Sequence, residues 1–206
     1  MLTIYGVYRS RASRNIWLAN ELGLPFKLVP VMQLYRLSGP DAATSVLNTK
    51  SPEFLKVNPN GHVPSIDDDG LILHESLAIN LYLARKHGGP LAPANVGEDG
   101  LMSMWSLWAA TEVEPHSLSI AQDGPTAVAI DALRAPFAVL QEALAKGFLV
   151  GDRFTVADIN VAEVVRYADG ATALFESAPR VKVWFEACRA RPAYRRMWDA
   201  REKEPA

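Results

Sequence analysis

The fold of the first half of this chain is decided by the stretch LTIYGVYRSRASRNIWLANELGLPFKLV, residues 2–29. Its apolar start predicts a strand over residues 2–6, and the spacing after a polar loop predicts a helix over residues 13–22. Gly23 and the proline two residues later end that helix. Residues 26–31 suit a second strand. A β-α-β unit of this length favours parallel strands joined by a right-handed crossover.

The rest of the first half completes an α/β layout. Residues 36–60 are polar and irregular in pattern. The run Asp67-Asp68-Asp69-Gly70 then lies between two apolar segments, which is a hairpin signal. Residues 75–86 read as a largely apolar helix, ended by a Gly-Gly-Pro sequence. The order β-α-β, connection, β-β-α is that of a thioredoxin-like domain.

The second half changes character and predicts an all-α bundle. Beyond about residue 98 the chain is rich in Ala, Glu, Arg and Leu at helical spacing. The sequence therefore predicts a thioredoxin-like domain over residues 1–86, a linker over 87–97 and an all-α domain over 98–206.

Composition excludes several classes of protein. The chain has 206 residues, 49% of them hydrophobic and 21% charged, which is typical of a globular protein. The net charge of -2 argues against nucleic acid held by a basic field. We expect no membrane span and no signal peptide, and hence a cytoplasmic protein. The single cysteine, Cys188, excludes an internal disulfide and a multi-cysteine zinc site, and we expect no bound metal.

The loop after the first strand carries the first candidate chemistry. Ser10 and Ser13 have the spacing of a CxxC motif with serine at both ends. A hydroxyl there can donate a hydrogen bond to a thiolate that a substrate brings, and helix-terminal amides favour the same anion. Arg9, Arg11 and Arg14 crowd this turn, so an anionic ligand would relieve their repulsion with the helix dipole. The alternative is a helix cap whose arginines face water.

Two further pairs suggest a peptide ligand. If the Val63–Pro64 bond is cis, the Val63 amide and carbonyl face outward, and an extended peptide can pair with them as an added strand. Glu75 and Ser76 lie where a strand ends and a helix begins, which suits an amino-acid head group. The alternative is again a helix cap.

A last motif is assigned to folding alone. Thr155 and Asp158 have the spacing of a capping box, and Phe154 with Ile159 that of a hydrophobic staple. We assign no chemistry to these residues.

Three segments in order carry a resemblance: NPNGHVP at residues 58–64, LHESLAINLYL at 73–83 and FTVADI at 154–159. Together they make the chain resemble the cytosolic glutathione transferases over nearly its whole length, nearest to the bacterial theta, beta and nu-like groups. The resemblance implies a thioredoxin-like domain followed by an all-α domain, a homodimer, and glutathione as co-substrate. From the net charge and the lack of a long apolar run, we expect neither nucleic acid nor a membrane as partner.

The resemblance also implies roles for single residues. Val63 pairs its backbone with the cysteinyl unit of glutathione, and Glu75 with Ser76 holds the γ-glutamyl head group. His62 approaches the glycyl end, although it could equally be an exposed loop residue. From charge alone, Arg11 or Arg14 could lower the pKa of the thiol, and we place Arg11 among the residues that bind glutathione.

The catalytic group is left open among several hydroxyls. Family members use Tyr, Ser or Cys near the first helix, and this chain has no cysteine there. Ser10 is the first choice because it precedes the helix by the expected distance. Tyr5 and Ser13 are the alternatives, followed by Tyr8, while ungapped comparison with serine-type members falls on Arg9.

We expect the binding site for the electrophile to include one helix of the second half. Trp105, Trp108 and His116 share part of it, although tryptophans at this spacing are also typical of core packing. The predicted function is a glutathione S-transferase acting on a small hydrophobic electrophile. The alternatives are a glutathione-dependent peroxidase, reductase, dehalogenase or isomerase, or a non-catalytic binding module of the same fold.

Overall fold

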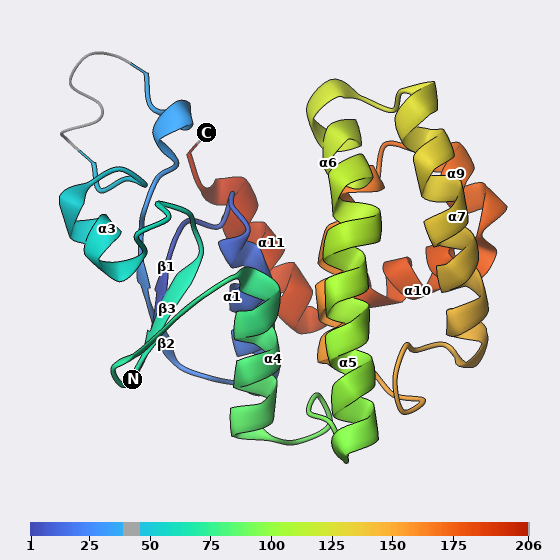
Figure 1. Ribbon diagram of the computed structural model, residues 1–206, viewed down its shortest axis with the longest axis horizontal. Helices are drawn as coiled ribbons and strands as arrows, with labels where there is room; N and C mark the ends of the chain where they lie inside the picture. Colours follow the sequence, from blue (N-terminus) through green and yellow to red (C-terminus); the bar gives the residue numbers. More distant parts are fainter. Residues whose placement is uncertain (39–45, 206) are drawn as a thin grey trace. The chain divides into compact units, whose positions relative to one another are not determined.

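The computed structural model describes residues 1–38 and 46–205, and it divides into two compact units (Figure 1). The first unit comprises Met1–Leu83 and Pro192–Ala206, and the second comprises Ala84–Arg191. The chain therefore leaves the first unit, builds the second and returns. The sequence pattern predicts one domain over residues 98–206, whereas Pro192–Ala206 packs in the first unit.

A four-stranded sheet forms the centre of the first unit. Its order is β2-β1-β3-β4, with β1 parallel to β2 and antiparallel to β3. The strands are β1 (Leu2–Tyr5), β2 (Phe26–Val29), β3 (Ser65–Asp68) and β4 (Leu71–His74). The predicted β-α-β unit is confirmed, although β2 ends two residues earlier than the sequence pattern predicted.

The predicted hairpin is also confirmed. Asp69 and Gly70 form a two-residue loop with φ of 53° and 93°. Both central residues of a type I′ turn need positive φ, so an Asp-Gly pair suits this position. The Gly70 amide donates to Asp67 Oδ1 at 2.8 Å, which closes the turn.

Helix α1 (Ala12–Leu22) covers the sheet and is itself covered by α11 (Pro192–Lys203). Gly23 ends α1 in the left-handed conformation, with φ of 65°. The Trp17 and Tyr194 rings meet edge to face at 4.9 Å, so an aromatic pair from opposite ends of the sequence joins the two helices.

The connection between β2 and β3 is more ordered than its composition predicted. It contains a 3₁₀ turn, η1 (Leu34–Arg36), and a short helix, α3 (Pro52–Val57). Proline is favourable at the first helical position, and Phe54 anchors α3 by burying all but 1% of its surface. Residues 39–45 of the segment that we expected to be irregular lie outside the described residues.

Helix α4 (Ser76–His87) runs across the boundary between the units. The elements that follow are helical, as predicted: α5 (Val96–Trp108), η2 (Ala109–Val113), α6 (Glu114–Asp123), α7 (Ala127–Ala143), η3 (Leu144–Lys146), α8 (Val156–Val165), η4 (Arg166–Ala168), α9 (Thr172–Ser177) and α10 (Pro179–Ala190). In the described part of the chain, no helix has both the length and the apolar character that crossing a bilayer requires.

Helix α8 is the buried centre of the second unit, and all its residues are buried. Its predicted capping box is present: the Thr155 amide donates to Asp158 Oδ2 at 2.8 Å, and the Thr155 hydroxyl donates to the same oxygen at 3.1 Å. Such a cap starts a helix in a buried place without leaving backbone donors unsatisfied.

Candidate functional site

The sheet register gathers the sequence-predicted residues of the first unit at one edge. Tyr5, the last residue of β1, pairs with Ser65, the first of β3, and Ser65 pairs with His74, the last of β4. The loop after β1, the segment before β3 and the start of α4 therefore leave the sheet at the same place. Each of the three carries one of the candidate motifs.

Gly6 brings the first two of these segments together. A Cβ at Gly6 would lie 2.8 Å from the Cβ of Ala12, 3.5 Å from Ser10 Oγ and 3.6 Å from the Cβ of Val63. The backbone of Gly6, with φ of 148°, therefore allows the β1–α1 loop to approach Val63 closely.

The segment before β3 has a cis bond between Val63 and Pro64. Asn58 holds the loop that precedes it by donating from Nδ2 to the His62 carbonyl at 2.8 Å. The side chain of His62 is exposed, so the structure places it on the surface beside Val63.

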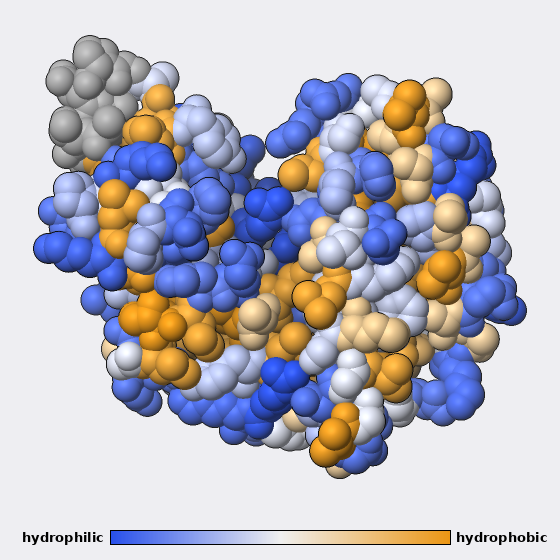
Figure 2. Space-filling view, viewed as in Figure 1, coloured by the Kyte–Doolittle hydropathy of each residue, from blue (hydrophilic) through white to orange (hydrophobic). Residues whose placement is uncertain are grey.

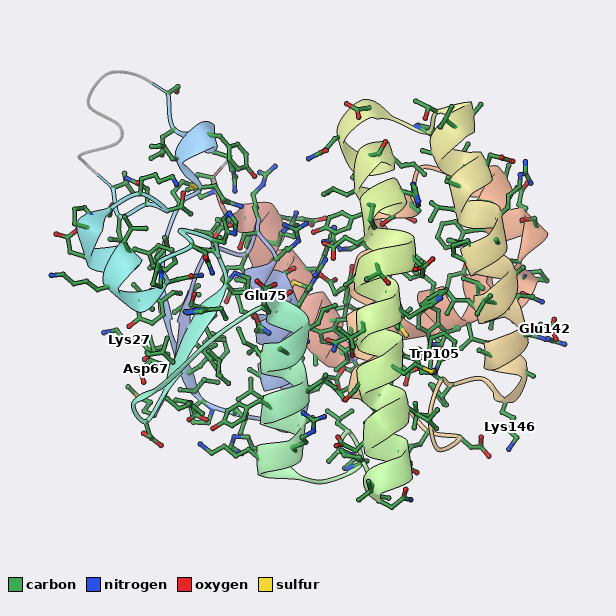
Figure 3. The ribbon with its side chains drawn as sticks, in the orientation of Figure 1. Lys27, Asp67, Glu75, Trp105, Glu142 and Lys146 are labelled. Carbon is green, nitrogen blue, oxygen red and sulfur yellow. The ribbon has the colours of Figure 1, made fainter. Side chains whose placement is uncertain are left out.

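Glu75 adopts an uncommon backbone conformation where β4 passes into α4. Its φ is 66°, in the left-handed region that non-glycine residues seldom occupy, and its side chain is exposed (Figure 3). A conformation of this kind costs on the order of 1–3 kcal/mol and is typical of functional sites. Ser76, which begins α4, is buried.

A buried polar cluster beneath Glu75 joins α1 to α4. Arg14 donates from Nη1 to Ser76 Oγ at 3.1 Å. Asn15 donates from Nδ2 to the Ser76 carbonyl at 2.8 Å and to Asn80 Oδ1 at 2.7 Å. Asn15 Oδ1 is buried and accepts no hydrogen bond from the described residues. The cluster fixes the position and orientation of Ser76, because both its hydroxyl and its carbonyl accept hydrogen bonds.

This cluster corrects one expectation about the arginines. The helix-cap alternative predicts that all three arginines of the β1–α1 turn face water, but Arg14 is 1% exposed and donates a hydrogen bond to Ser76. Arg9 and Arg11 are exposed, as that alternative expected.

The hydroxyl candidates differ in what they already bind. Ser10 donates from Oγ to the Val7 carbonyl at 2.7 Å, and its Oγ accepts the amide of Ala12, the first residue of α1, at 3.1 Å. The N-cap position itself is held by Arg11, whose side chain makes no capping hydrogen bond. Ser13 is fully buried. The Tyr5 ring packs at a tilt against that of Phe54, with centroids 6.3 Å apart. Ser10 is therefore the candidate nearest the start of α1, and its hydroxyl proton is donated to the Val7 carbonyl.

Glu204, directly after α11, contributes to this edge of the sheet and was missed by the sequence reasoning. Its carboxylate accepts the backbone amides of Tyr8 at 2.9 Å and Arg9 at 2.7 Å. No local signal could have found this contact, because about 195 residues separate its partners.

In the second unit, the structure brings two of the three predicted residues together. The rings of Trp105 and Trp108 meet edge to face at 5.1 Å on α5. Trp105 is 8% exposed and belongs to the core, whereas Trp108 is half-buried. Figure 3 labels Trp105 on α5. His116 is exposed on α6, beyond the π-helical segment η2.

Comparison with known proteins covers both units. Residues 4–91 match the model of the glutathione S-transferase N-terminal domain, and residues 121–192 match that of the C-terminal domain. Glutathione S-transferase 3 of Zea mays is 31% identical over 221 aligned residues, which cover 95% of this chain and 92% of the relative.

Solved structures agree with the sequence comparison. Glutathione transferase F7 of Populus trichocarpa superposes with a TM-score of 0.81 at 26% identity, covering 98% of this chain and 99% of that one. Glutathione S-transferase I bound to lactoylglutathione superposes with a TM-score of 0.79 at 25% identity, covering 97% and 99%.

These relatives also test which group of glutathione transferases the chain resembles most. The maize and poplar names do not support the expected bacterial theta, beta or nu-like group. The two matching domains, and an identity that extends over nearly the whole chain, do establish the wider grouping: this chain belongs to the glutathione S-transferase family.

Proposed function

We propose that this chain is a glutathione transferase. It binds glutathione at the sheet edge of the first unit, favours the thiolate and directs it to a small hydrophobic electrophile. The sulfur forms a bond to an electrophilic carbon, and the leaving group departs with its electron pair. Where the carbon belongs to an activated double bond, the resulting carbanion takes a proton from water instead. The observation that carries the proposal is Glu75, held in a left-handed conformation beside the buried and doubly anchored Ser76.

Glu75 and Ser76 suit the γ-glutamyl head group by charge. The α-carboxylate of glutathione accepts from the Ser76 hydroxyl at the start of α4, where the helix dipole also favours an anion. The exposed carboxylate of Glu75 pairs with the α-ammonium. Val63 pairs its backbone with the cysteinyl unit, and the exposed His62 approaches the glycyl end. The charge of the exposed Arg11 favours the thiolate.

Ser10 is the proposed donor to the thiolate. A free thiol has a pKa of about 8.5, and each unit by which the site lowers it corresponds to about 1.4 kcal/mol in favour of the thiolate. The Ser10 hydroxyl has one proton, which the Val7 carbonyl accepts at 2.7 Å. Donation to sulfur therefore requires this hydroxyl to rotate away from Val7 when glutathione binds.

The experiment is a titration of bound glutathione, followed by the ultraviolet absorbance of its thiolate. Ser10→Ala should raise the pKa of the bound thiol without abolishing binding. Because Ser10 Oγ also accepts the amide of Ala12 at the start of α1, the variant should lose about 1 kcal/mol of stability. Thr126→Ala is the matched control, since the Thr126 hydroxyl caps α7 by accepting the Ala129 amide and lies in the other unit.

The outcomes separate the alternatives. An unchanged thiol pKa in Ser10→Ala would leave that residue with its structural role only, and a raised thiol pKa in Tyr5→Phe would transfer the donor role to Tyr5. The absence of any heat of binding at millimolar glutathione would make the chain a non-catalytic module. Turnover of a chlorinated aromatic, compared with that of an organic peroxide, distinguishes conjugation from reduction.

Trp108 and His116 are the proposed contacts to the electrophile in the second unit. Both offer surface to a ligand, because Trp108 is half-buried and His116 is exposed. Trp105, at 8% exposed, supports Trp108 through their edge-to-face contact. Trp108→Ala should therefore raise the KM for the electrophile and leave that for glutathione unchanged.

A homodimer is proposed from the apolar surface. Leu71 and Ile72 of β4 are 45% and 37% exposed. On α5, Leu101, Met104 and Leu107 are 45%, 47% and 68% exposed. Figure 2 shows apolar side chains reaching the surface in both units. Light scattering should give twice the chain mass, and Met104→Glu should give a monomer; a wild-type monomer would overturn this part of the proposal.

A further inference from the structure

The segment that follows α11 places a carboxylate on the loop after β1. Glu204 accepts the Tyr8 amide on Oε1 at 2.9 Å and the Arg9 amide on Oε2 at 2.7 Å. Two successive backbone donors thus bind the two oxygens of one anion. Hydrogen bonds to a charged acceptor are about twice as strong as neutral ones.

The surroundings of this contact are positively charged. Arg201 donates from Nη1 to the Tyr8 carbonyl, Arg36 donates to the Arg9 carbonyl at 3.2 Å, and Arg9 itself reaches the Glu204 carbonyl at 3.5 Å. Burial raises the pKa of the Tyr8 hydroxyl, and the charge of Glu204 raises it further. The arginine-rich turn indicated an anionic ligand from the sequence, and here the chain itself supplies an anion.

We propose that the amides of Tyr8 and Arg9 form an anion site for the glutathione thiolate, and that Glu204 occupies it until glutathione displaces it. The inference rests on the proposed function. The loop lies directly before Ser10 and, through Gly6, against Val63, to which the cysteinyl unit is assigned. One pair of amides cannot hold a carboxylate and a thiolate together, so Glu204 lowers the apparent affinity for glutathione.

The test compares two neighbouring glutamates by calorimetry. Glu204→Gln removes the competing charge from the amides. Glu202→Gln removes the same charge from the last turn of α11, where the Glu202 carboxylate accepts from Trp198 Nε1 at 2.9 Å rather than from the loop amides. If the site is open about a tenth of the time, Glu204→Gln should lower the Kd for glutathione on the order of tenfold, and Glu202→Gln should not change it.

A ligand without a thiolate shows whether Glu204 competes with glutathione through its charge or only through its volume. S-Methylglutathione keeps the tripeptide but cannot ionise at sulfur, so its Kd should be the same in the wild type and in Glu204→Gln. An equal gain for both ligands would mean that the segment only obstructs the site. Weaker glutathione binding in Glu204→Gln would make the contact a clamp that shapes the loop. Either result overturns the inference.

The amide resonances provide a readout that needs no glutathione. In ¹H–¹⁵N spectra of the free protein, Glu204→Gln should shift the Tyr8 and Arg9 amides, and Glu202→Gln should leave them in place. Unmoved amides in Glu204→Gln overturn the inference even where every variant binds glutathione. The absence of glutathione binding in the wild type and both variants overturns the proposed function instead.

Discussion

Two buried polar clusters, one in each unit, serve opposite purposes. In the second unit, Asp158 Oδ1 accepts from Trp184 Nε1 at 2.9 Å and from the Leu149 amide at 3.2 Å, while Oδ2 accepts twice from Thr155. Every oxygen has its donors inside the protein. The Asp158 cluster therefore has nothing left to offer a ligand, and its role is to hold the start of α8.

In the first unit, the cluster of Arg14, Asn15, Ser76 and Asn80 leaves one buried acceptor without a donor in the described part of the chain. Asn15 uses its amide nitrogen twice, on Ser76 and Asn80, but its oxygen accepts nothing from the described residues. Glu75, which precedes Ser76 in the chain, has an uncommon φ and an exposed side chain. A buried cluster that is fully satisfied stabilises a fold, whereas one with capacity left beside a strained residue is typical of a binding site.

The largest expected effect comes from removing the complete cluster. Asp158→Ala leaves the Trp184, Leu149 and Thr155 N–H groups without their acceptor, at about 1–3 kcal/mol each. The second unit should lose more than about 4 kcal/mol of stability, measured by urea unfolding. Asp131→Ala, at an exposed carboxylate, is the control. A loss below about 1 kcal/mol would refute the structural role assigned to Asp158.

The next effect tests the incomplete cluster. Asn15→Ala removes the donor to the Ser76 carbonyl and to Asn80, and should reduce stability by about 2–4 kcal/mol. Unlike Asp158→Ala, it should also weaken glutathione binding in the protein that remains folded, because Ser76 loses an anchor. Calorimetry of the folded fraction at low temperature checks this. Unchanged affinity would make the two clusters equivalent and remove the distinction drawn here.

A smaller effect separates stability from binding at Glu75. Glycine accepts the left-handed conformation without strain, so Glu75→Gly should change stability by less than about 1 kcal/mol. It should nevertheless weaken glutathione binding by about tenfold or more, because the carboxylate is lost. Asp152→Gly, at a residue with φ of 53° in the second unit, is the matched control and should leave binding unchanged.

Much of this architecture could be predicted because its signals are local. The β-α-β unit, the Asp-Gly hairpin and the capping box at Thr155 each depend on residues a few positions apart. The left-handed Gly23 and the Val63–Pro64 motif are of the same kind. Glu75 and Ser76 were likewise identified from their position between a strand and a helix, although the uncommon φ of Glu75 has no signature in the sequence.

What could not be predicted depends on contacts between distant parts of the chain. Arg14 appeared to be one of three exposed arginines, because its partner, Ser76, lies 62 residues away. Glu204 had no local reason to bind the loop after β1. Helix α11 has the composition of its neighbours in sequence, and only its packing on Trp17 assigns it to the first unit.

The smallest expected effect is a pH dependence in the second unit. Arg153 donates to both oxygens of Glu98, at 2.6 and 3.0 Å, and these hydrogen bonds lower the pKa of Glu98 to about 2. A lowered pKa in the folded state adds stability above the unfolded value of 4.5, and this contribution is lost as the pH falls towards 2. The difference in Tm between the wild type and Glu98→Gln should therefore be present at neutral pH and shrink in acid. A difference that grows in acid would contradict this assignment.

The return of the chain to the first unit affects how the protein is made. During synthesis the residues up to Leu83 leave the ribosome long before Pro192–Ala206, so the early β-α-β sheet waits for α11 while the second unit is translated. Domains generally fold as units in the order of their synthesis. Here the first unit to begin is the last to be completed, and Glu204 reaches the loop after β1 at the end of that process. A ribosome-bound chain that stops before Pro192 should leave the α1 side exposing Trp17 to chaperones, although every residue of the proposed glutathione contacts has already been made.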